Sequence, residues 1–420
     1  MLELNSADRQ ELLERFLRYV AIDTQSRPGS ATYPSTDKQK DLLRLLVSEL
    51  RELGLHDAAM DEHGYVMATL PSNLPPEQAG RIPVVGLLAH VDTYPETSGK
   101  DVKPQIIENY DGREIPLAGT PGVALTVEEN PNLARVIGDT VITTDGTTLL
   151  GADDKAGLAE IMTALSWLKR NPDHPHGTLR VAFTPDEEIG AGTKHFDVAR
   201  FGADLAYTLD GSDIGNIEDE TFCADSAKVT VTGRDIHPGY GKNKLLNAVR
   251  IASELVTRVA EGPLPETTEG REGFLHPHIM SGNVGSATVD LLVRDFTVEG
   301  LEKLEARLKS LGEELEAKYD GAKLDIEISE SYRNMKYPIS KRPEVLTNAL
   351  EAMRRAGIEP KQEAIRGGTD GSKLSEAGLP TPNIFAGGQN MHSVREWVAL
   401  GWMAKAVVTV LHLVEIYAEG

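Results

Sequence analysis

The most constraining feature of this sequence is an unbroken apolar run, Ile82–Ala89 (IPVVGLLA), followed at once by His90 and Asp92. Such a run predicts a strand that is buried on both faces, as in a parallel sheet covered by helices on both sides. In open α/β sheets, binding residues gather beyond the carboxyl ends of the strands. His90 and Asp92 stand at such an end and, two residues apart in extended chain, point to the same side.

Helical and strand patterns alternate after this run. Leu158–Leu168 is predicted to be helical, and Leu179–Thr184 and Leu205–Leu209 are predicted to be strands. The alternation predicts an α/β catalytic domain with a mixed, mostly parallel sheet flanked by helices. Other expected elements are a helix at 6–21 capped by Ser6, a helix from Ser35 or Thr36 to Leu53, a loop excursion or small hairpin at 94–132, and a last helix at 394–417.

The pattern changes near Cys223, where strands with two-residue alternation stand beside two long amphipathic helices. Strands are predicted at 228–233, 287–295 and 323–329, and helices at 244–260 and 298–319. This block fits an α+β unit with a four-stranded sheet covered by two helices on one face. We therefore expect a catalytic domain in two parts, residues 1–215 and 336–420, with a smaller domain at 216–335 inserted between them.

Composition and charge exclude several classes of function. The formal net charge of -22 argues against a nucleic-acid partner, and no apolar run is expected to span a membrane. The charged N-terminus lacks the pattern of a signal peptide. The single cysteine, Cys223, rules out an intrachain disulfide and fits a reducing, cytoplasmic compartment. A metal site would therefore use histidine and carboxylate ligands.

Four further motifs place acidic or histidine side chains after predicted strands or at helix starts. They are GADDKAG with Asp153 and Asp154, TPDEEIG with Glu187 and Glu188, TLDG with Asp210, and GGQNMH with His392. Each motif alone is more typical of a solvated turn or a helix cap. One carboxylate from each of the three acidic motifs, together with His90 and His392, gives two histidines and three carboxylates. This donor set holds two zinc ions if one carboxylate bridges them.

The motifs HVD, GADDKAG, TPDEEIGAG, TLDG, RGGTDGS and GGQNMH, in this order, resemble the co-catalytic dizinc metallopeptidases. That family includes carboxypeptidase G and succinyl-diaminopimelate desuccinylase. The segments TDGTTLLGADDKAG, VTVTGRDIHPGYGKNK and RGGTDGSKLSEAGLPTPN are more similar to its tripeptide aminopeptidase branch. The resemblance covers essentially the whole chain, and it implies a zinc exopeptidase-like catalytic domain with an inserted lid domain.

The resemblance also implies a metal ligand set of two Zn²⁺ per subunit, for which Co or Mn are possible substitutes. One ion would be held by His90 and Asp210, the other by Glu188 and His392, and both by the bridging Asp153.

Catalytic roles follow from the same resemblance. Asp92 would orient the metal ligands without binding a metal itself. Glu187 would be the general base for a dizinc-bound water that attacks the peptide bond. A cis peptide bond would join Asp153 and Asp154.

Three residues of the inserted domain and its neighbourhood are expected to bind substrate. By the resemblance, His237 would donate to the developing oxyanion. Arg294 and Arg366 would grip the carboxylate at the peptide C-terminus, so that their position favours tripeptides. The plainer alternatives are a turn residue for His237, a salt bridge to Asp290 or Asp295 for Arg294, and a loop contact for Arg366.

The predicted function is a zinc-dependent aminopeptidase that removes the N-terminal residue from tripeptides. The alternatives are a dipeptidase or an N-acyl amino acid amidohydrolase on the same scaffold, and, from another class, a non-catalytic binding protein. Relatives suggest a homodimer through the inserted domain, whose edge strands could pair across a two-fold axis. His276 and His278 are expected to lie in a loop of that domain.

Overall fold

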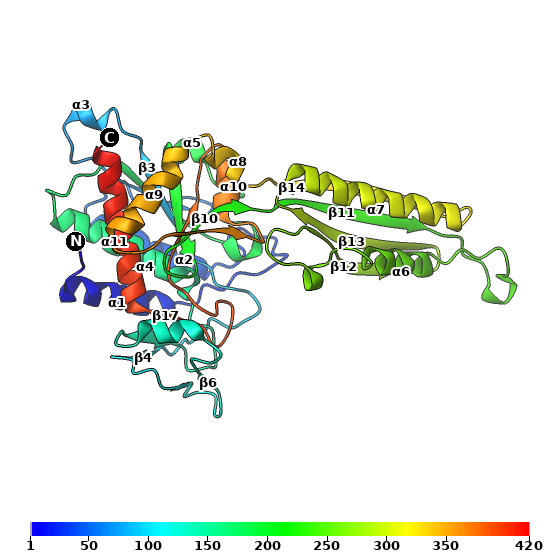
Figure 1. Ribbon diagram of the computed structural model, residues 1–420, viewed down its shortest axis with the longest axis horizontal. Helices are drawn as coiled ribbons and strands as arrows, with labels where there is room; N and C mark the ends of the chain where they lie inside the picture. The colour runs from blue at the N-terminus through cyan, green and yellow to red at the C-terminus, as the bar shows by residue number, and fades with distance from the viewer. Residues whose placement is uncertain (1, 420) are drawn as a thin grey trace. The chain divides into compact units, whose positions relative to one another are not determined.

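The computed structural model describes residues 2–419, which form two compact units (Figure 1). Unit 1 comprises the chain up to Asp219, Pro338–Glu363 and the chain from Thr369 onward. Unit 2 comprises Glu220–Tyr337 and the short segment Ala364–Gly368. Unit 2 is therefore formed by two separate stretches of the sequence, and the second of these carries Arg366.

Unit 1 is built on an eight-stranded sheet in the order β1-β2-β8-β3-β9-β16-β10-β15. The neighbours β8, β3, β9 and β16 are parallel, whereas β1, β2 and β10 pair in antiparallel fashion. The predicted mixed, mostly parallel sheet is confirmed. Its strands are β1 (Ala59–Met60), β2 (Val66–Leu70), β3 (Val85–His90), β8 (Leu179–Thr184), β9 (Leu205–Gly211), β10 (Asn216–Thr221), β15 (Lys361–Ile365) and β16 (Asn383–Phe385).

The central strand β3 is buried at all six positions, which explains its continuous apolar sequence. The strand begins at Val85 rather than at Ile82, because Pro83 has no N–H to donate to a neighbouring strand. It also extends to His90, so this side chain belongs to the strand end itself.

Helices cover the sheet and complete the core of unit 1. The helix α4 (Ala152–Arg170) packs against β3 and β9, and also against α1 (Ser6–Val20) and α11 (Leu400–Glu419). The apolar side chains of α4 that face this core, such as Leu158 and Leu165, are fully buried. The other α-helices described in this unit are α2 (Gln39–Glu52), α3 (Pro76–Ala79), α5 (Val198–Phe201), α9 (Pro343–Arg355) and α10 (Asp370–Glu376), and the boundary between the units falls within α8 (Lys336–Ile339).

Three helix starts differ from the prediction. Asn5, rather than Ser6, caps α1, because its side-chain oxygen accepts the backbone N–H groups of Ala7 and Asp8. The helix α2 begins at Gln39. The last helix begins at Leu400, since the residues before it form the strand β17 (Trp397–Ala399).

Among residues 2–419, one helix, α11, is long and apolar enough by length and composition to cross a membrane. The sequence pattern predicts no such run. About four-fifths of the apolar window is buried inside the protein (78%), so α11 is a core helix of unit 1.

The segment between β3 and α4 forms a small subdomain rather than a plain loop. β5 (Ile115–Pro116) and β6 (Ala124–Leu125) form a hairpin, as one of the two alternatives predicted. A separate three-stranded sheet has the order β17-β7-β4, with β4 at Gln105–Ile107 and β7 at Val141–Thr143, and the 3-10 helix η1 (Pro131–Val136) connects the hairpin to β7.

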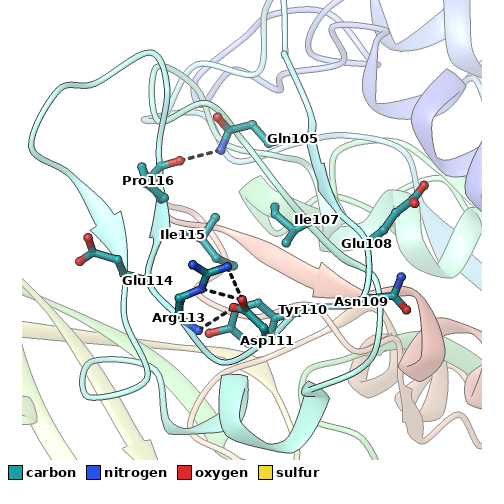
Figure 2. Close-up of a pocket in the computed structure, with 10 residues that line it drawn as sticks. All are labelled: Gln105, Ile107, Glu108, Asn109, Tyr110, Asp111, Arg113, Glu114, Ile115 and Pro116. Carbon is teal, nitrogen blue, oxygen red and sulfur yellow. Dashed lines mark hydrogen bonds and ion pairs between the residues drawn. The ribbon is translucent and has the colours of Figure 1, made fainter.

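A pocket of about 640 Å³ lies between β4 and β5 (Figure 2). The Gln105 side chain links the two strands, donating to the Pro116 carbonyl at 3.1 Å and accepting from the Ala118 N–H at 2.9 Å. The guanidinium of Arg113 pairs with Asp111 beside it. No residue that lines this pocket belongs to the predicted catalytic or metal set.

Unit 2 contains a four-stranded antiparallel sheet in the order β12-β13-β11-β14. Side chains alternate between buried and exposed along β11, as at Lys228 and Val229. The buried face packs against α6 and α7, which confirms the predicted α+β unit. The elements are β11 (Cys223–Thr232), β12 (Phe274–Gly282), β13 (Ser286–Asp295), β14 (Lys323–Tyr332), α6 (Ala248–Val259) and α7 (Val298–Lys318), with the short 3-10 helices η3 (Pro238–Tyr240) and η4 (Pro265–Thr267).

The edge strand β12 is the strand of this sheet that the sequence pattern does not reveal. His276 and His278 lie in this strand, so the prediction that they belong to a loop is wrong. Pro277 stands between them, and the pairing with β13 shifts register after it. An edge strand tolerates such a proline and bulge, and both disrupt the two-residue alternation.

Candidate metal and catalytic site

Three neighbouring parallel strands end at one edge of the sheet in unit 1 and carry the first predicted site residues. β3 ends at His90, and β9 carries Asp210 one position before its last residue. β8 leads within three residues into the 3-10 helix η2 (Glu187–Ile189). Because β8, β3 and β9 lie side by side and run parallel, their side chains emerge at a common edge, as in other open α/β sheets.

The start of α4 brings Asp153 to the same edge. Gly151 caps the helix with φ of +83°, and a cis peptide bond joins Asp153 to Asp154, as the resemblance implied. The two carboxylate oxygens of Asp153 face different histidines. Oδ1 lies 2.9 Å from Nε2 of His90, and Oδ2 lies 3.1 Å from Nε2 of His392. This is the arrangement expected of a carboxylate shared between two cations.

Each histidine also has a second carboxylate neighbour. His392 Nε2 lies 2.9 Å from Glu188 Oε2, and His90 Nε2 lies 3.6 Å from Asp210 Oδ1. The other oxygen of Glu188, Oε1, is buried and has no hydrogen-bond partner among residues 2–419. A buried carboxylate oxygen without a donor is costly, and a bound cation would satisfy it.

The charges of this cluster are unbalanced toward the negative. Burial, and after it the charge of Asp153, raises the pKa of Glu188 to about 8. For His392, burial lowers the pKa, but hydrogen bonds to Asp153 and Glu188 outweigh it and raise the pKa to about 10. Against the effect of burial, the two histidines hold the pKa of Asp153 below its usual range, whereas that of Glu188 stays raised. The two histidines thus do not offset every carboxylate of the cluster, and divalent cations would supply further positive charge.

Asp92 is fully buried and connects several parts of the site. Its carboxylate accepts the backbone N–H groups of Glu187 at 2.9 Å and of Glu188 at 3.2 Å. One of its oxygens lies 3.4 Å from Nδ1 of His90. Asp92 therefore supports both the strand-end histidine and the turn that carries the two glutamates.

The Glu187 carboxyl lies in the same small cavity as His90 and Asp210. Burial raises its pKa well above the usual range; the charge of His90 opposes this, and those of Asp210 and Asp370 add to it. A carboxyl group of this kind can hold a proton at a pH where an exposed one would lose it.

The residue before Glu187, Asp186, fixes the turn that separates the two glutamates. Its backbone is left-handed, with φ of +61°. Its buried carboxylate accepts from the backbone N–H and hydroxyl of Ser35 at 2.6 and 2.5 Å, and from the Gln39 amide at 2.7 Å. Gln39 in turn accepts the Asp186 N–H at 3.1 Å. Ser35 and Gln39, the first residue of α2, thus hold this turn in place.

His392 is held by groups of the subdomain that follows β3. It is a non-glycine residue with φ of +63°, a conformation that needs support from its surroundings. The Thr97 hydroxyl donates to its carbonyl at 2.8 Å, and the Tyr94 ring stacks on the imidazole with ring centroids 4.1 Å apart. These contacts fix a side chain that is 42% exposed.

The predicted substrate-binding residues all belong to unit 2. His237 is exposed at the start of η3, where its Nδ1 accepts the Gly239 N–H at 3.2 Å. Arg294 donates to the backbone carbonyls of Asp225 and Val293, each at 2.9 Å, and its guanidinium lies over the Tyr332 ring.

Arg366 makes the loop contact that was the plainer alternative for it. Its guanidinium donates at 2.8 to 2.9 Å to three groups of one loop, namely the carbonyls of Gly270 and Glu272 and the hydroxyl of Thr268. It also lies 5.7 Å from the Phe274 ring, and Phe274 is the direct cross-strand partner of Arg294. Arg366 thus lies over the ring of a residue whose backbone pairs with that of Arg294.

Three residues of the site had no role in the sequence analysis. The donor atoms of Asp154, His90 and Asp210 lie within 4.8 Å of one another. Asp370 lines the same cavity and accepts from the Thr184 hydroxyl at 2.9 Å. Glu396 accepts N–H groups of the segment that carries Asp153. Asp154 and Asp370 stood inside quoted motifs, GADDKAG and RGGTDGS, whereas no local signal marked Glu396.

Comparison with known proteins identifies the family. The chain is 48% identical to peptidase T of Geobacillus thermodenitrificans over 98% of its own length and 99% of the relative's. It is 49% identical to peptidase T of Desulfitobacterium hafniense over 97% and 98% of the two chains. The solved structure of the aminopeptidase PepT of Bacillus cereus has the same fold, with a TM-score of 0.76 at 23% identity, and the match covers 98% of this chain and 99% of that one. Residues 143–416 match the model of peptidase family M20/M25/M40, and the chain belongs to that family.

Proposed function

We propose that this protein is a metal-dependent aminopeptidase that removes the N-terminal residue from tripeptides. Its closely similar relatives are named peptidase T, and a solved structure with the same fold is described as a tripeptidase from Staphylococcus aureus. The observation that carries the proposal is the Asp153 carboxylate, whose two oxygens each face a different histidine. A mononuclear site or a structural helix cap would not need that arrangement.

Two divalent cations fit the donor set at this edge of the sheet. We assign one to His90 and Asp210, the other to Glu188 and His392, and Asp153 to both. The buried, unpartnered oxygen of Glu188 and the negative charge of the cluster support this assignment. Imidazole and carboxylate donors suit zinc, and they also accept cobalt or manganese. When bound, the two cations polarise the scissile carbonyl and lower the pKa of the attacking water.

Glu187 is the proton carrier in this proposal. Its carboxylate takes the proton of the attacking water and then gives it to the amine of the departing peptide. Asp92 keeps Glu187 in place through the backbone N–H.

Unit 2 supplies substrate recognition in this proposal. Arg294 and Arg366 bind the carboxylate at the peptide C-terminus, and His237 donates to the developing oxyanion. The backbone of Arg294 pairs with that of Phe274, and the guanidinium of Arg366 lies over the Phe274 ring. Recognition of a free C-terminal carboxylate selects short peptides, and we assign the preference for tripeptides to these two arginines.

The substrate assignment is tested by turnover of trialanine, dialanine and N-acetylalanine by the zinc-loaded protein, with a chelator-treated sample as the control for metal dependence. We expect trialanine to be hydrolysed fastest, with free alanine and dialanine as the products. Faster turnover of dialanine would indicate a dipeptidase, and faster turnover of N-acetylalanine an amidohydrolase, and either result would refute the tripeptidase assignment.

The proposed partner, besides the peptide, is a second copy of the chain. The edge strand β12 of unit 2 exposes Ile279 and Met280 to about half of their full extent (53% and 49%), and such an edge can pair with its own copy across a two-fold axis. Sedimentation should give twice the chain mass, and Ile279→Lys should restore the monomer while Glu313→Lys on α7 does not. A wild-type protein that remains monomeric would rule the dimer out.

We also propose a cytoplasmic location, because the one cysteine, Cys223, is buried as a free thiol. Fractionation of producing cells tests this, since recovery of the protein with the membranes or the medium would contradict it.

A further inference from the structure

We propose that Glu396 is a positioning residue that holds the Asp153 segment, and with it the shared carboxylate, in the geometry that binds two cations. The inference rests on the proposed function, because it concerns the same metal site. Glu396 lies outside the motifs that carry the family resemblance, and its side chain does not belong to the ligand set.

The segment that leads into α4 needs acceptors for its backbone N–H groups. At the start of a helix these groups have no partner inside the helix. Here the need is greater than usual, because Gly151 is left-handed and both Asp153 and Asp154 depart from helical backbone angles. The N-cap residue Gly151 also has no side chain with which to accept a hydrogen bond.

The Glu396 carboxylate meets this need. Its Oε2 accepts the N–H groups of Leu150 and Gly151, each at 2.7 Å, and its Oε1 accepts the Asp153 N–H at 3.1 Å. Only 1% of the Glu396 residue is exposed. A buried carboxylate is tolerated where several N–H groups donate to it, and both of its oxygens are used here by one short segment.

Glu396 is itself held on regular structure. The Thr143 hydroxyl, on β7, donates to the Glu396 carbonyl at 3.0 Å. The next residue, Trp397, begins β17, which pairs with β7 in register with Thr143. The Glu396 backbone is thus held by the Thr143 hydroxyl and by the pairing of the next residue with β7.

The same short segment carries a predicted metal ligand. His392 stands four residues before Glu396. Its Nε2 lies 3.1 Å from the side-chain oxygen Oδ2 of Asp153. One segment therefore holds Asp153 twice, through the backbone by Glu396 and through the side chain by His392. Loosening the backbone hold would move a carboxylate on which both cations depend, so the affinities for both should fall together.

The test is Glu396→Gln, which keeps the shape of the side chain and changes one oxygen into an NH₂ group. That group cannot accept, so either Asp153 or both Leu150 and Gly151 lose their acceptor and face a donor. The matched control is Glu129→Gln. It neutralises the exposed ion-pair partner of Arg395, the neighbour of Glu396, and leaves every group that bonds to the Asp153 segment unchanged.

Two measurements on purified wild-type and variant proteins decide the proposal. Zinc affinity is measured by competition with a chelator, and amide hydrogen exchange of residues 150–153 is measured on the metal-free protein. In Glu396→Gln we expect both zinc affinities to fall by about 10–100-fold, as is typical when a group that supports a metal ligand is lost. We expect the amides of 150–153 to exchange faster, and we expect no change of either kind in Glu129→Gln.

A Glu396→Gln protein that binds two zinc ions with wild-type affinity, or whose 150–153 amides stay protected, would overturn the proposal. If that variant does not fold, Thr143→Val decides in its place. It removes only the hydroxyl that holds the Glu396 carbonyl, so it should weaken both zinc affinities in the same direction, and unchanged affinities would overturn the proposal. A wild-type protein that binds fewer than two ions would instead refute the proposed function itself.

Discussion

The Asp92 carboxylate accepts the backbone N–H of Glu187 at 2.9 Å, which ties the proposed base to a side chain that also approaches His90. The link runs through the backbone, so Asp92 acts on the position of Glu187 rather than on its carboxyl group. We therefore expect Asp92→Asn to lower kcat by about 10–100-fold, because one accepting oxygen becomes a donor. Asp111→Asn, at an exposed ion pair, is the control, and equal activity of the two variants would contradict this role.

Glu187→Gln tests the proton carrier. The amide keeps the size of the side chain but cannot take a proton, so kcat should fall by about 10²–10⁴-fold while both metals stay bound. Turnover of trialanine and elemental analysis of the same sample check the two parts. Full activity would show that another group is the base, and loss of metal would show that Glu187 is a ligand.

Glu160 should make the protein less stable as the pH rises. It is fully buried on α4, neither of its carboxylate oxygens has a hydrogen-bond partner among residues 2–419, and burial raises its pKa well above 4.5. A raised folded-state pKa gives stability that is present below the unfolded pKa and is lost as the pH rises toward the folded one.

Glu160→Gln removes this dependence, since the amide stays neutral. Its free energy of unfolding relative to wild type should grow by about 1.4 kcal/mol per pH unit over the range where Glu160 is ionised only in the unfolded chain. Urea unfolding at about pH 5 and about pH 7 measures the difference, with exposed Glu14→Gln as control. A difference that does not change with pH would contradict the prediction.

If Arg294 and Arg366 bind the substrate carboxylate, Arg294→Ala should slow the hydrolysis of trialanine more than that of its C-terminal amide. Loss of a charge-assisted contact should lower kcat/KM for trialanine on the order of 10–100-fold. Trialanine amide lacks the carboxylate, so its kcat/KM should change little. Steady-state kinetics on both substrates give the comparison, and an equal loss for both would mean that Arg294 supports the structure of unit 2 and not the peptide carboxylate.

Residue patterns predicted the elements whose burial is reflected in their own sequence. β3 was recognisable because burial on both faces demands an apolar run, and α7 because one face of a long helix must be apolar. β12 was not recognisable, because an edge strand with a proline and a bulge is set by its partner β13 rather than by its own pattern. The start of α11 was misplaced for a similar reason, since β17 exists only through its pairing with β7.

Some residues of the site could likewise be predicted from local patterns, and others could not. His90, Glu188 and Asp210 could be proposed because strand ends meet at one edge of a sheet. Glu396 could not, because its partners Leu150 and Gly151 lie about 245 residues away in sequence and are brought to it only by the folded chain. Arg366 was expected to bind substrate, and its present contacts with the Gly270–Glu272 loop could not be read from its motif.

The central claim is that Asp153 joins two cation sites in one cluster. The most direct test is the metal content of the purified protein after it is loaded with zinc and passed through a desalting column, measured per chain by elemental analysis. The account predicts two ions per chain, and it predicts that Asp153→Ala loses both. One ion per chain in the wild-type protein, or a variant that keeps either ion at wild-type affinity, would contradict it.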